Sequence, residues 1–498
     1  MSLRRNLVAN YLGQGWIALM GIAFTPFYIR HLGMEAFGLI GFFVLMQSWL
    51  SVLDVGLTPT LNREVSRFKA GASAGSGIRR ILHRFELVSA GIPALVAGVF
   101  GLASAWIAGT WLKSSQLPLP VVAGAIDAMG VVVGLRLLEG MYRGGLLGLQ
   151  QHDRVNALAA ALATARGLGS VATLVFVRTS IEAFFVWQIA ISALSVLLYR
   201  RALARQLPPL DKSHQIDRAV MSGVWRFSGA MFTNSLLAIL LTQVDKLLLS
   251  RLLSLEAFGR YMFAATVAGA LFQLIGPLAQ SYYPKLAELV ARGDGQLVSN
   301  AYHHGAQLMT IVLIPAGLGL FFFAHPLIAL WSGDAALAAS ASPLVSVLVL
   351  GTVLNGFMNV PYMLQLAHGW PSLAMRVNFF AVLLLVPSLF YIVPHFGAVG
   401  AAWAWVTLNA GYVAIGISLM HRRLLPGEMA RWYLYDILWP AGAATAVFTL
   451  GFVFLPRSDS PWILMLELAA TATLALLAAI AGSSEFRGLL TWMVAKLT

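Results

Sequence analysis

Cysteine is absent from the sequence, and charged residues are scarce. The first absence excludes disulfide bonds, thiolate catalysis and metal sites built on cysteine. Asp, Glu, Lys and Arg together make up 11% of the 498 residues, whereas a soluble protein carries about 25%. So few charges could not cover the surface of a large soluble enzyme, and the sequence therefore excludes that class.

Apolar residues are correspondingly abundant, at 59% of the chain with a mean hydropathy of +0.79. A hydrocarbon core about 30 Å thick needs about 20 apolar residues for each helical crossing. Both faces of the long runs are apolar, which favours helices over the alternating strands of a membrane barrel. We predict an all-α polytopic membrane protein with 14 transmembrane helices at 7–28, 37–58, 87–111, 121–141, 155–176, 183–199, 227–249, 261–282, 308–330, 344–364, 377–393, 399–420, 433–454 and 462–480. No cleavage site of the A-x-A type follows the first run, which we interpret as an uncleaved span.

The net charge of +13 follows the predicted membrane topology. With both termini in the cytoplasm, 24 of the 33 lysines and arginines fall in cytoplasmic segments, six fall outside and three lie within spans. Cytoplasmic loops of membrane proteins carry such an excess of positive residues. The excess therefore predicts that both termini are cytoplasmic, and it removes the reason to expect nucleic acid as a partner.

One motif occurs twice, at an offset of 221 residues. Residues 30–38 (RHLGMEAFG) align with residues 251–259 (RLLSLEAFG), and Phe42 matches Phe263 further along. Six predicted spans separate the copies, an even number, so the two halves share one orientation in the membrane. We expect two six-helix lobes with an appended helix pair, divided into a first lobe at 1–205, a cytoplasmic linker at 206–222, a second lobe at 223–424, the helix pair at 425–482 and an amphipathic cytoplasmic tail at 483–498. A cavity between two such lobes is the usual position of a transported solute.

Three basic residues fall within the predicted spans: Arg136, Arg166 and Lys246. A charge near the bilayer centre costs about 2.5–3.5 kcal/mol, so each is a candidate functional residue. A guanidinium donates paired hydrogen bonds to phosphate and stays charged, and we expect these cations to line the cavity and bind an anionic group. For Arg136 the alternative is a structural pair with Glu139, three residues along the same helix. Arg166 has no charged neighbour within four residues, so its partner must come from another helix, from water or from a ligand.

Acidic residues in the spans are candidates for coupling to an ion gradient. Asp127, Glu139 and Asp245 could exchange H+ or Na+ during a transport cycle. For Asp245 an equally simple alternative is a pair with the adjacent Lys246, whose long side chain reaches the outer interface. Three arginines at the outer boundary are candidates for an outer gate, although interface anchoring is the simpler account; they are Arg30, Arg251 and Arg260.

No pattern typical of catalysis or of a metal centre occurs in the sequence. It lacks a P-loop, and His303 and His304 are adjacent, so they cannot face one site on a helix. We therefore expect neither enzymatic activity nor a cofactor, and we expect Asp436, in the appended pair, to be structural. Several amides within the spans could hydrogen-bond sugar hydroxyls, although packing contacts between helices are commoner for such residues. They are Asn10, Gln14, Asn355, Asn359, Gln365, Asn378 and Asn409.

Several segments carry a likeness to a known family of transporters. They are LGMEAFGL (32–39), YRGGLLGLQQHDRVN (142–156), residues 225–229 with QVDKLLLSRLLSLEAFGRY (243–261), LNGFMNVPYMLQLAHG (354–369) and FGAVGAAWAW (396–405). In order and spacing they resemble the Wzx-type oligosaccharide flippases of the multidrug/oligosaccharidyl-lipid/polysaccharide exporter superfamily. The resemblance covers about residues 1–420 and implies two six-helix lobes around a cationic cavity, with the last two helices outside it.

The resemblance further implies a polyprenyl-pyrophosphate-linked oligosaccharide as the substrate, moved by alternating access and coupled to an ion gradient. It implies a bacterial inner membrane, with a polysaccharide polymerase and glycosyltransferases as partners, and we expect a monomer. A drug exporter of the same superfamily is one alternative, and it would need a net acidic cavity. A membrane enzyme of glycan assembly is another, but such enzymes carry a soluble domain or a large catalytic loop, and the loops here are short.

Overall fold

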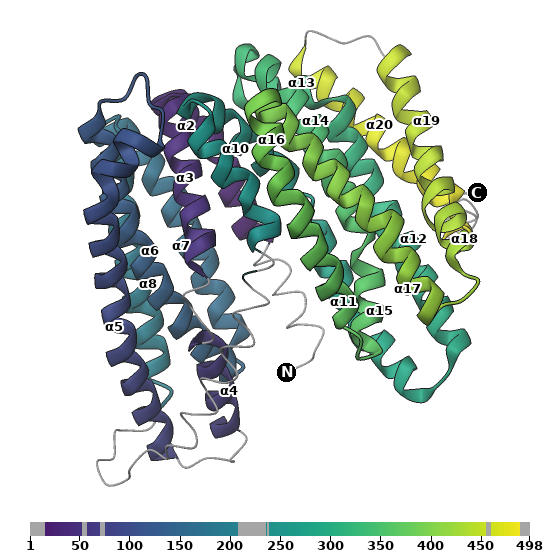
Figure 1. Ribbon diagram of the computed structural model, residues 1–498, viewed down its shortest axis with the longest axis horizontal. Coiled ribbons are helices and arrows are strands. Elements are labelled where there is room, and N and C mark those ends of the chain that lie inside the picture. The colour runs from purple at the N-terminus through teal and green to yellow at the C-terminus, as the bar shows by residue number, and fades with distance from the viewer. Residues whose placement is uncertain are drawn as a thin grey trace. The chain divides into compact units, whose positions relative to one another are not determined.

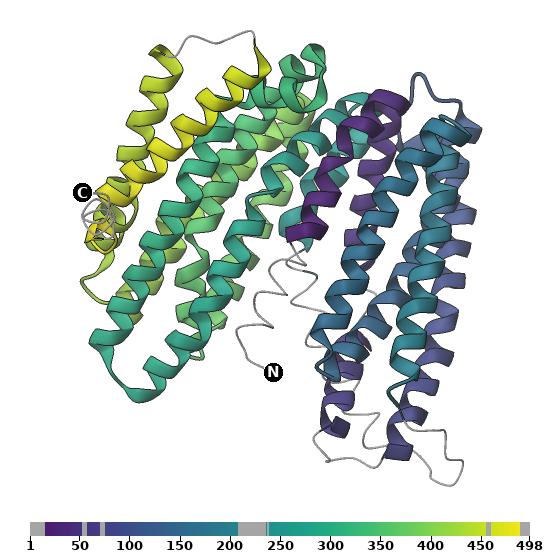
Figure 2. The same cartoon turned by 180° about the vertical axis from the view of Figure 1, so that it is seen from behind.

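The computed structural model describes residues 15–51, 57–69, 75–207, 236, 239–454 and 460–488. These residues are predominantly helical, as predicted, and the one β pairing among them is an isolated bridge between Lys113 and Ser254. The chain divides into two compact units, Met1–Met262 and Phe263–Thr498, and helix α10 (Leu255–Gly269) runs across the division. Figure 1 labels the helices, and Figure 2 shows the same ribbon from behind.

The central helix of the first unit is α6. Among the helices described in this unit before α10 are α2 (Thr25–Leu32), α3 (Met34–Leu50), α4 (Leu57–Lys69), α5 (Gly75–Trp106), α6 (Leu119–Gly148), α7 (His152–Ala172) and α8 (Ile181–Ala204). Helix α6 packs against α3, α4, α5 and α8, and Figure 1 shows α5, α6 and α8 side by side. Its buried residues Val122, Ile126, Met129 and Val133 recur every three or four positions, the spacing of one helix face.

In the second unit, α12 has the central position. The helices after α10 are α11 (Phe272–Arg292), α12 (Gly295–Phe322), α13 (Ala324–Ser332), α14 (Ala335–Phe357), α15 (Asn359–Ala367), α16 (Ser372–Gly411), α17 (Ile417–Leu424), α18 (Met429–Arg431), α19 (Trp439–Phe454) and α20 (Pro461–Gly482). Helix α12 packs against α11, α14, α19 and α20, so the last two helices are joined to the unit through it.

Ten helices in the described residues are long and apolar enough to cross a membrane. Nine of them overlap predicted spans one to one, and the tenth, Ser372–Leu424, contains both 377–393 and 399–420. The predicted spans 7–28, 37–58 and 227–249 extend into residues outside the described part of the chain. The all-α, multi-span prediction is therefore confirmed, while the count of 14, the two six-helix lobes and their boundaries remain predictions.

Helix α16 is a hairpin of two arms. Its backbone leaves the helical region at Gly397, where φ is 57° and ψ is −143°, a conformation that glycine adopts without a steric penalty. Gly400 lies against Ile392, and the Tyr412 hydroxyl donates to Asn378 Oδ1 at 2.8 Å. These contacts show that the second arm runs back along the first, which explains why one continuous helical segment holds two predicted spans.

The amphipathic segment after the second predicted span forms α4, but its apolar face is not on the surface. Leu61, Val65 and Phe68 recur on one helical face, a pattern that by itself predicts a helix lying on the lipid headgroups. In the structure Leu61 and Val65 are fully buried and belong to a core cluster with Met141 and Tyr142 of α6. The periodicity predicted the helix correctly, but it predicted the wrong surface for the helix to pack on. An apolar stripe can pack on other helices of the protein as well as on the membrane.

The two copies of the repeated motif contact each other within the first unit. A methyl group added at Gly38 would lie 2.3 Å from the carbonyl oxygen of Leu255, and one added at Gly259 would lie 2.6 Å from that of Met34. Met34 corresponds to Leu255, and Gly38 corresponds to Gly259, at the offset of 221 residues. Each copy therefore uses the same pair of positions against the other, which is the pattern of a two-fold contact.

Candidate functional site

Arg136 lies at the meeting point of several helices of the first unit. It projects from α6, donates from Nη1 to Gln47 of α3 and donates from Nη2 to Gln188 Oε1 of α8 at 3.4 Å. Its guanidinium also lies 5.0 Å from the ring centroid of Phe43, within the range of a cation–π contact. Uncharged groups therefore hold this cation in place.

Arg166, on α7, forms the ion pair that the sequence left open. Its Nη2 lies 3.6 Å from Oε2 of Glu139 on α6, and the two side chains are 24% and 19% exposed. Another helix thus supplies the partner of Arg166, which was one of the possibilities expected. Glu139 forms its ion pair with Arg166 rather than with Arg136, so the alternative of a self-neutralising pair within α6 is not the arrangement found.

The basic centre, defined as Arg136, Arg166 and Glu139, has two positive charges and one negative charge. Nε of Arg136 and both Nε and Nη2 of Arg166 are buried and have no hydrogen-bond acceptor among the described residues. The contact of Nη2 with Glu139 is an ion pair that is longer than a hydrogen bond. A buried donor without an acceptor costs about 1–3 kcal/mol, and more when charged, so the centre is suited to a ligand that supplies anionic oxygen atoms.

Lys246 and Asp245 form a separate pair. Lys246 Nζ donates to the carbonyl of Thr242 at 2.6 Å and lies 3.4 Å from Asp245 Oδ1. The other carboxylate oxygen accepts a hydrogen bond of 2.6 Å from the Tyr261 hydroxyl. These contacts match the alternative of an adjacent charge pair, and they share no residue with the basic centre.

Asp127 also lies apart from the basic centre. It is exposed on α6, nine residues and therefore about 13 Å before Arg136 along the helix axis. A methyl group at Gly101 of α5 would lie 4.0 Å from its Oδ1. Its proposed role in coupling stays a prediction.

The three arginines expected at the outer boundary have different surroundings. Arg30 is exposed in the last turn of α2, and Arg251 lies 5.0 Å over the ring of Trp111. Arg260 pairs with Glu256 one turn earlier in α10. A role for these arginines in an outer gate stays a prediction.

Sequence reasoning missed the polar residues that position Arg136. Gln188 is buried and donates from Nε2 to Ser170 Oγ of α7 at 3.0 Å, so a chain of hydrogen bonds connects α6, α8 and α7. Gln47 completes it from α3. The sequence does show that Gln47 and Gln188 are amides inside apolar runs. Because they are far apart along the chain, it does not show that both contact the guanidinium of Arg136.

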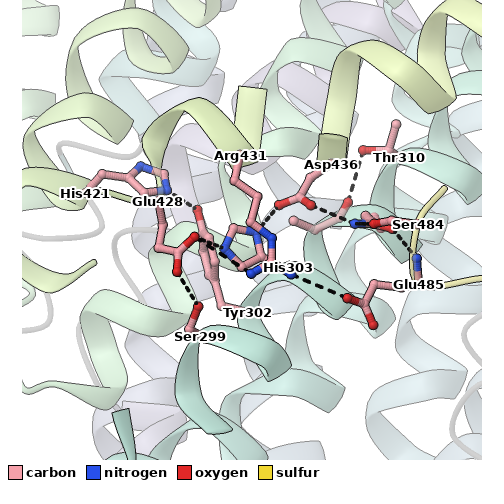
Figure 3. Close-up of polar contacts among 12 residues, drawn as sticks. Ser299, Tyr302, His303, Thr310, His421, Glu428, Arg431, Asp436, Ser484 and Glu485 are labelled. Atoms are coloured by element: carbon pink, nitrogen blue, oxygen red, sulfur yellow. Dashed lines mark hydrogen bonds and ion pairs between the residues drawn. The ribbon is translucent and has the colours of Figure 1, made fainter. Parts of the chain in front are cut away.

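The second unit contains another buried polar network, centred on His303 of α12 (Figure 3). The His303 ring hydrogen-bonds through Nδ1 to Asp436, and its Nε2 lies 3.3 Å from Glu428 Oε2. Asp436 also accepts from Gln307 Nε2 at 2.8 Å. Asp436 and His303 are both completely buried, so Asp436 joins the segment before α19 to α12.

The same network reaches the segment after α20. Gln307 donates to Ser484 Oγ at 2.9 Å and accepts the backbone N–H of Glu485 at 3.0 Å. Figure 3 shows Ser484 and Glu485 beside the His303 cluster. His304 turns to a different partner, the Tyr282 hydroxyl at 2.6 Å, which confirms that the two adjacent histidines do not face one site.

Comparison with curated proteins gives distant but extensive matches. A putative O-antigen transporter of Shigella flexneri is 19% identical over 407 residues, covering 81% of this chain and 94% of that protein. The teichuronic acid biosynthesis protein TuaB of Bacillus subtilis (strain 168) is 23% identical over 306 residues, covering 60% of this chain and 62% of that protein.

Solved structures share the fold. The lipid II flippase MurJ in an inward closed conformation matches with a TM-score of 0.72 and 11% identity, over 97% of this chain and 100% of that one. An inward-facing multidrug resistance transporter of the MATE family, in the MOP superfamily, matches with a TM-score of 0.68 and 11% identity, over 82% and 96%. Residues 29–341 match the Polysaccharide biosynthesis protein family. Since this match covers more than half of the sequence, the chain belongs to that family, and the likeness to Wzx-type flippases expected from its motifs is confirmed.

Proposed function

We propose that this chain moves a polyprenyl-pyrophosphate-linked oligosaccharide from the cytoplasmic to the periplasmic leaflet, for the biosynthesis of a surface polysaccharide. The observation that carries the proposal is the basic centre, which holds two arginines and one carboxylate inside membrane-spanning helices. The names of the relatives support it, since one is a putative O-antigen transporter and a structural neighbour is a lipid II flippase.

The physical task explains why such a centre is needed. A hydrated glycan and a charged pyrophosphate cannot cross hydrocarbon without a polar route. In the proposed cycle the polyprenyl chain stays in the lipid while the headgroup enters a cavity that is open to the cytoplasm. Rocking of the two lobes then closes the inner side and opens the outer side, as in other transporters built from repeats.

The basic centre also suggests how an ion could be coupled to the substrate. A phosphate that binds Arg166 competes with Glu139, because both are anionic partners of the same guanidinium. Displaced from Arg166, the Glu139 carboxylate loses its cationic partner, which makes it a candidate site for the coupling ion. Substrate and ion would then be linked through one residue, with Asp127 and Asp245 as the other candidate coupling acids.

The remaining features of the proposal follow from the sequence. The chain would lie in a bacterial inner membrane with both termini in the cytoplasm, because that orientation satisfies the distribution of lysine and arginine. It would act as a monomer without a cofactor or resident metal, alongside a polymerase and glycosyltransferases that make and use the lipid-linked glycan.

The experiment that tests the function replaces Arg166 with Glu in cells that depend on this chain for surface polysaccharide. The variant should lose the polysaccharide, since reversal of the charge removes the positive excess of the basic centre. Arg154→Glu is the matched control, because Arg154 is exposed on the same helix and contacts Gln151 at 3.1 Å. Polysaccharide is measured by gel electrophoresis of surface extracts, and drug tolerance is measured in parallel.

Each alternative function gives a different outcome. A drug exporter would show a changed drug tolerance in the Arg166→Glu strain while surface polysaccharide is unchanged. A glycan-assembly enzyme would convert its substrate as purified protein in detergent, where there are no leaflets to cross. Loss of polysaccharide without a change in drug tolerance, and no turnover in detergent, is the result that the flippase proposal requires.

A further inference from the structure

The α16 hairpin encloses an apolar groove between its two arms. The groove has a volume of about 750 Å³, and its lining is almost entirely apolar. Leu384 on the first arm and Trp403 on the second line it and are 70% and 50% exposed. The Ser372–Leu424 span has 11% of its most apolar window buried, the smallest share of the ten candidate spans. By this measure the hairpin is the least buried of the described spans.

A smaller pocket, lined by both apolar and amide side chains, adjoins the groove at the end away from the Gly397 turn. Its volume is about 190 Å³, and it shares Val377 and Tyr412 with the groove. Its lining includes four of the amides that could hydrogen-bond sugar hydroxyls; they are Asn355, Asn359, Gln365 and Asn378. The apolar groove thus leads into a cluster of amides. This arrangement matches a lipid whose apolar chain is joined to a polar headgroup that can form hydrogen bonds.

Packing accounts for two of these amides but not for the others. Asn355 donates to Asn409 Oδ1 at 2.8 Å, and Asn359 donates to the carbonyl of Asn355 at 3.0 Å. Gln365 is 7% exposed, and its Oε1 is buried without a hydrogen-bond partner among the described residues. Asn378 accepts from Tyr412 through Oδ1, which leaves its NH2 group to donate. The pocket therefore offers an unused acceptor and a donor, which match the hydroxyl and acylamino groups of a sugar.

Positive charge lies at the same end of the hairpin. Arg376 is exposed and directly precedes Val377, the residue that groove and pocket share. Arg422 and Arg423 lie in the last turn of α17, where the second arm ends, and Arg423 lies 4.3 Å over the ring of Trp370. None of these three arginines lines the groove or the pocket, but Arg376 adjoins Val377, which lines both, so its guanidinium is the candidate partner for a phosphate.

From this arrangement we propose that the α16 hairpin binds the lipid-linked glycan as it enters from the bilayer. The isoprenoid chain lies in the groove, the first sugar hydrogen-bonds Gln365 and Asn378, and Arg376 binds the pyrophosphate between them. The inference rests on the proposed function, and it adds a docking site in the second unit to the basic centre of the first. It commits to the polyprenyl-linked glycan as the occupant, because ordinary phospholipid uses the groove but has no need of the amide pocket.

The test measures equilibrium binding to the full chain in nanodiscs. The probes are undecaprenyl-pyrophosphate N-acetylglucosamine, its farnesyl analogue and undecaprenyl pyrophosphate without a sugar. Ala381→Phe fills the groove, and Leu383→Phe is its control, because Leu383 is exposed on the same arm but does not line the groove. Gln365→Leu removes the unpartnered acceptor while keeping a side chain of similar size.

The proposal predicts a distinct loss for each variant. Ala381→Phe should weaken binding of all three probes about tenfold, because Ala381 is one helical turn from Val377 and every isoprenoid chain that leaves the pyrophosphate passes it. Gln365→Leu should weaken the sugar-bearing probes about tenfold and leave undecaprenyl pyrophosphate unchanged. Leu383→Phe should bind all three probes as the wild type does.

Wild-type affinities for all probes in both variants would overturn the inference, and so would full displacement of the undecaprenyl probe by ordinary phospholipid. Unfolding of a variant would be seen by size exclusion, and Gln365→Asn then replaces Gln365→Leu. Polysaccharide export in cells tests the proposed function separately. If export fails in Arg166→Glu but continues in Gln365→Leu and Ala381→Phe, the docking site is refuted and the flippase proposal stands.

Discussion

At the residue scale, the basic centre depends on an unequal distribution of partners. Arg136 is held by two neutral amides and an aromatic ring, whereas Arg166 has the one carboxylate, Glu139. A charge surrounded by uncharged groups inside a membrane is costly. We infer that this cost is retained because the centre must remain able to accept an anion.

Replacement of Glu139 by Gln should strengthen anion binding at this centre. The change removes the carboxylate that competes for Arg166, so the affinity for inorganic pyrophosphate should rise by about tenfold or more, as expected from a charge-assisted hydrogen bond worth about 1.5–3 kcal/mol. Isothermal titration in detergent at low ionic strength measures it. Glu288→Gln is the control, because Glu288 is a 60% exposed carboxylate paired with Arg292 in α11.

Equal affinity of Glu139→Gln and the wild type for pyrophosphate would show that Glu139 does not compete with an anion for Arg166.

Part of this centre could be predicted from the sequence, since an arginine within an apolar run stands out against its neighbours. Gln47 and Gln188 could not be assigned to it, because they reach Arg136 from helices 89 and 52 residues away.

At the scale of elements, the repeated motif acts as a packing device between α3 and α10. Both glycines face backbone carbonyls at distances where any side chain would collide. The sequence predicted that the two copies were equivalent, but not that they touch, because equivalence along the chain sets no distance in space. It likewise predicted α4 but not the core cluster that buries it.

Gly38→Ala and Gly259→Ala should each lower stability by about 1–3 kcal/mol, the usual cost of an inserted methyl group in a tight contact. The measurement is the thermal midpoint of unfolding in detergent. Gly276→Ala in α11 is the control, because a methyl group there meets nothing within 4 Å. A midpoint unchanged in both test variants would contradict the close contact of the two copies.

The His303 network should hold the segment after α20 against α12. Asp436→Leu leaves His303 and Gln307 without their buried acceptor, at a cost of about 1–3 kcal/mol for each unpaired group. We expect faster hydrogen exchange in residues 483–488, whose contacts pass through Gln307. Glu467→Leu in α20 serves as the control. An unchanged rate of hydrogen exchange at residues 483–488 in Asp436→Leu would show that the His303 network does not hold this segment against α12.

At the scale of the whole molecule, much of the architecture follows from hydropathy alone. Long apolar runs must form helices that satisfy their own backbone hydrogen bonds in lipid, and nine predicted spans correspond one to one with helices of the structure. The break at Gly397 falls between the predicted spans 377–393 and 399–420, which form the two arms of α16. The sequence could not predict which side chains converge. Such contacts depend on how each helix is rotated about its own axis, and a helix that is apolar on all faces does not determine that rotation.

The most direct measurement of the central claim is translocation of a lipid-linked glycan by the purified chain in proteoliposomes. The wild type should move undecaprenyl-pyrophosphate N-acetylglucosamine between leaflets, as detected by a lectin added outside the vesicles. Arg166→Glu should be slower by at least about tenfold, and Arg154→Glu should match the wild type. Translocation by Arg166→Glu at the wild-type rate would contradict the claim that the basic centre handles the pyrophosphate.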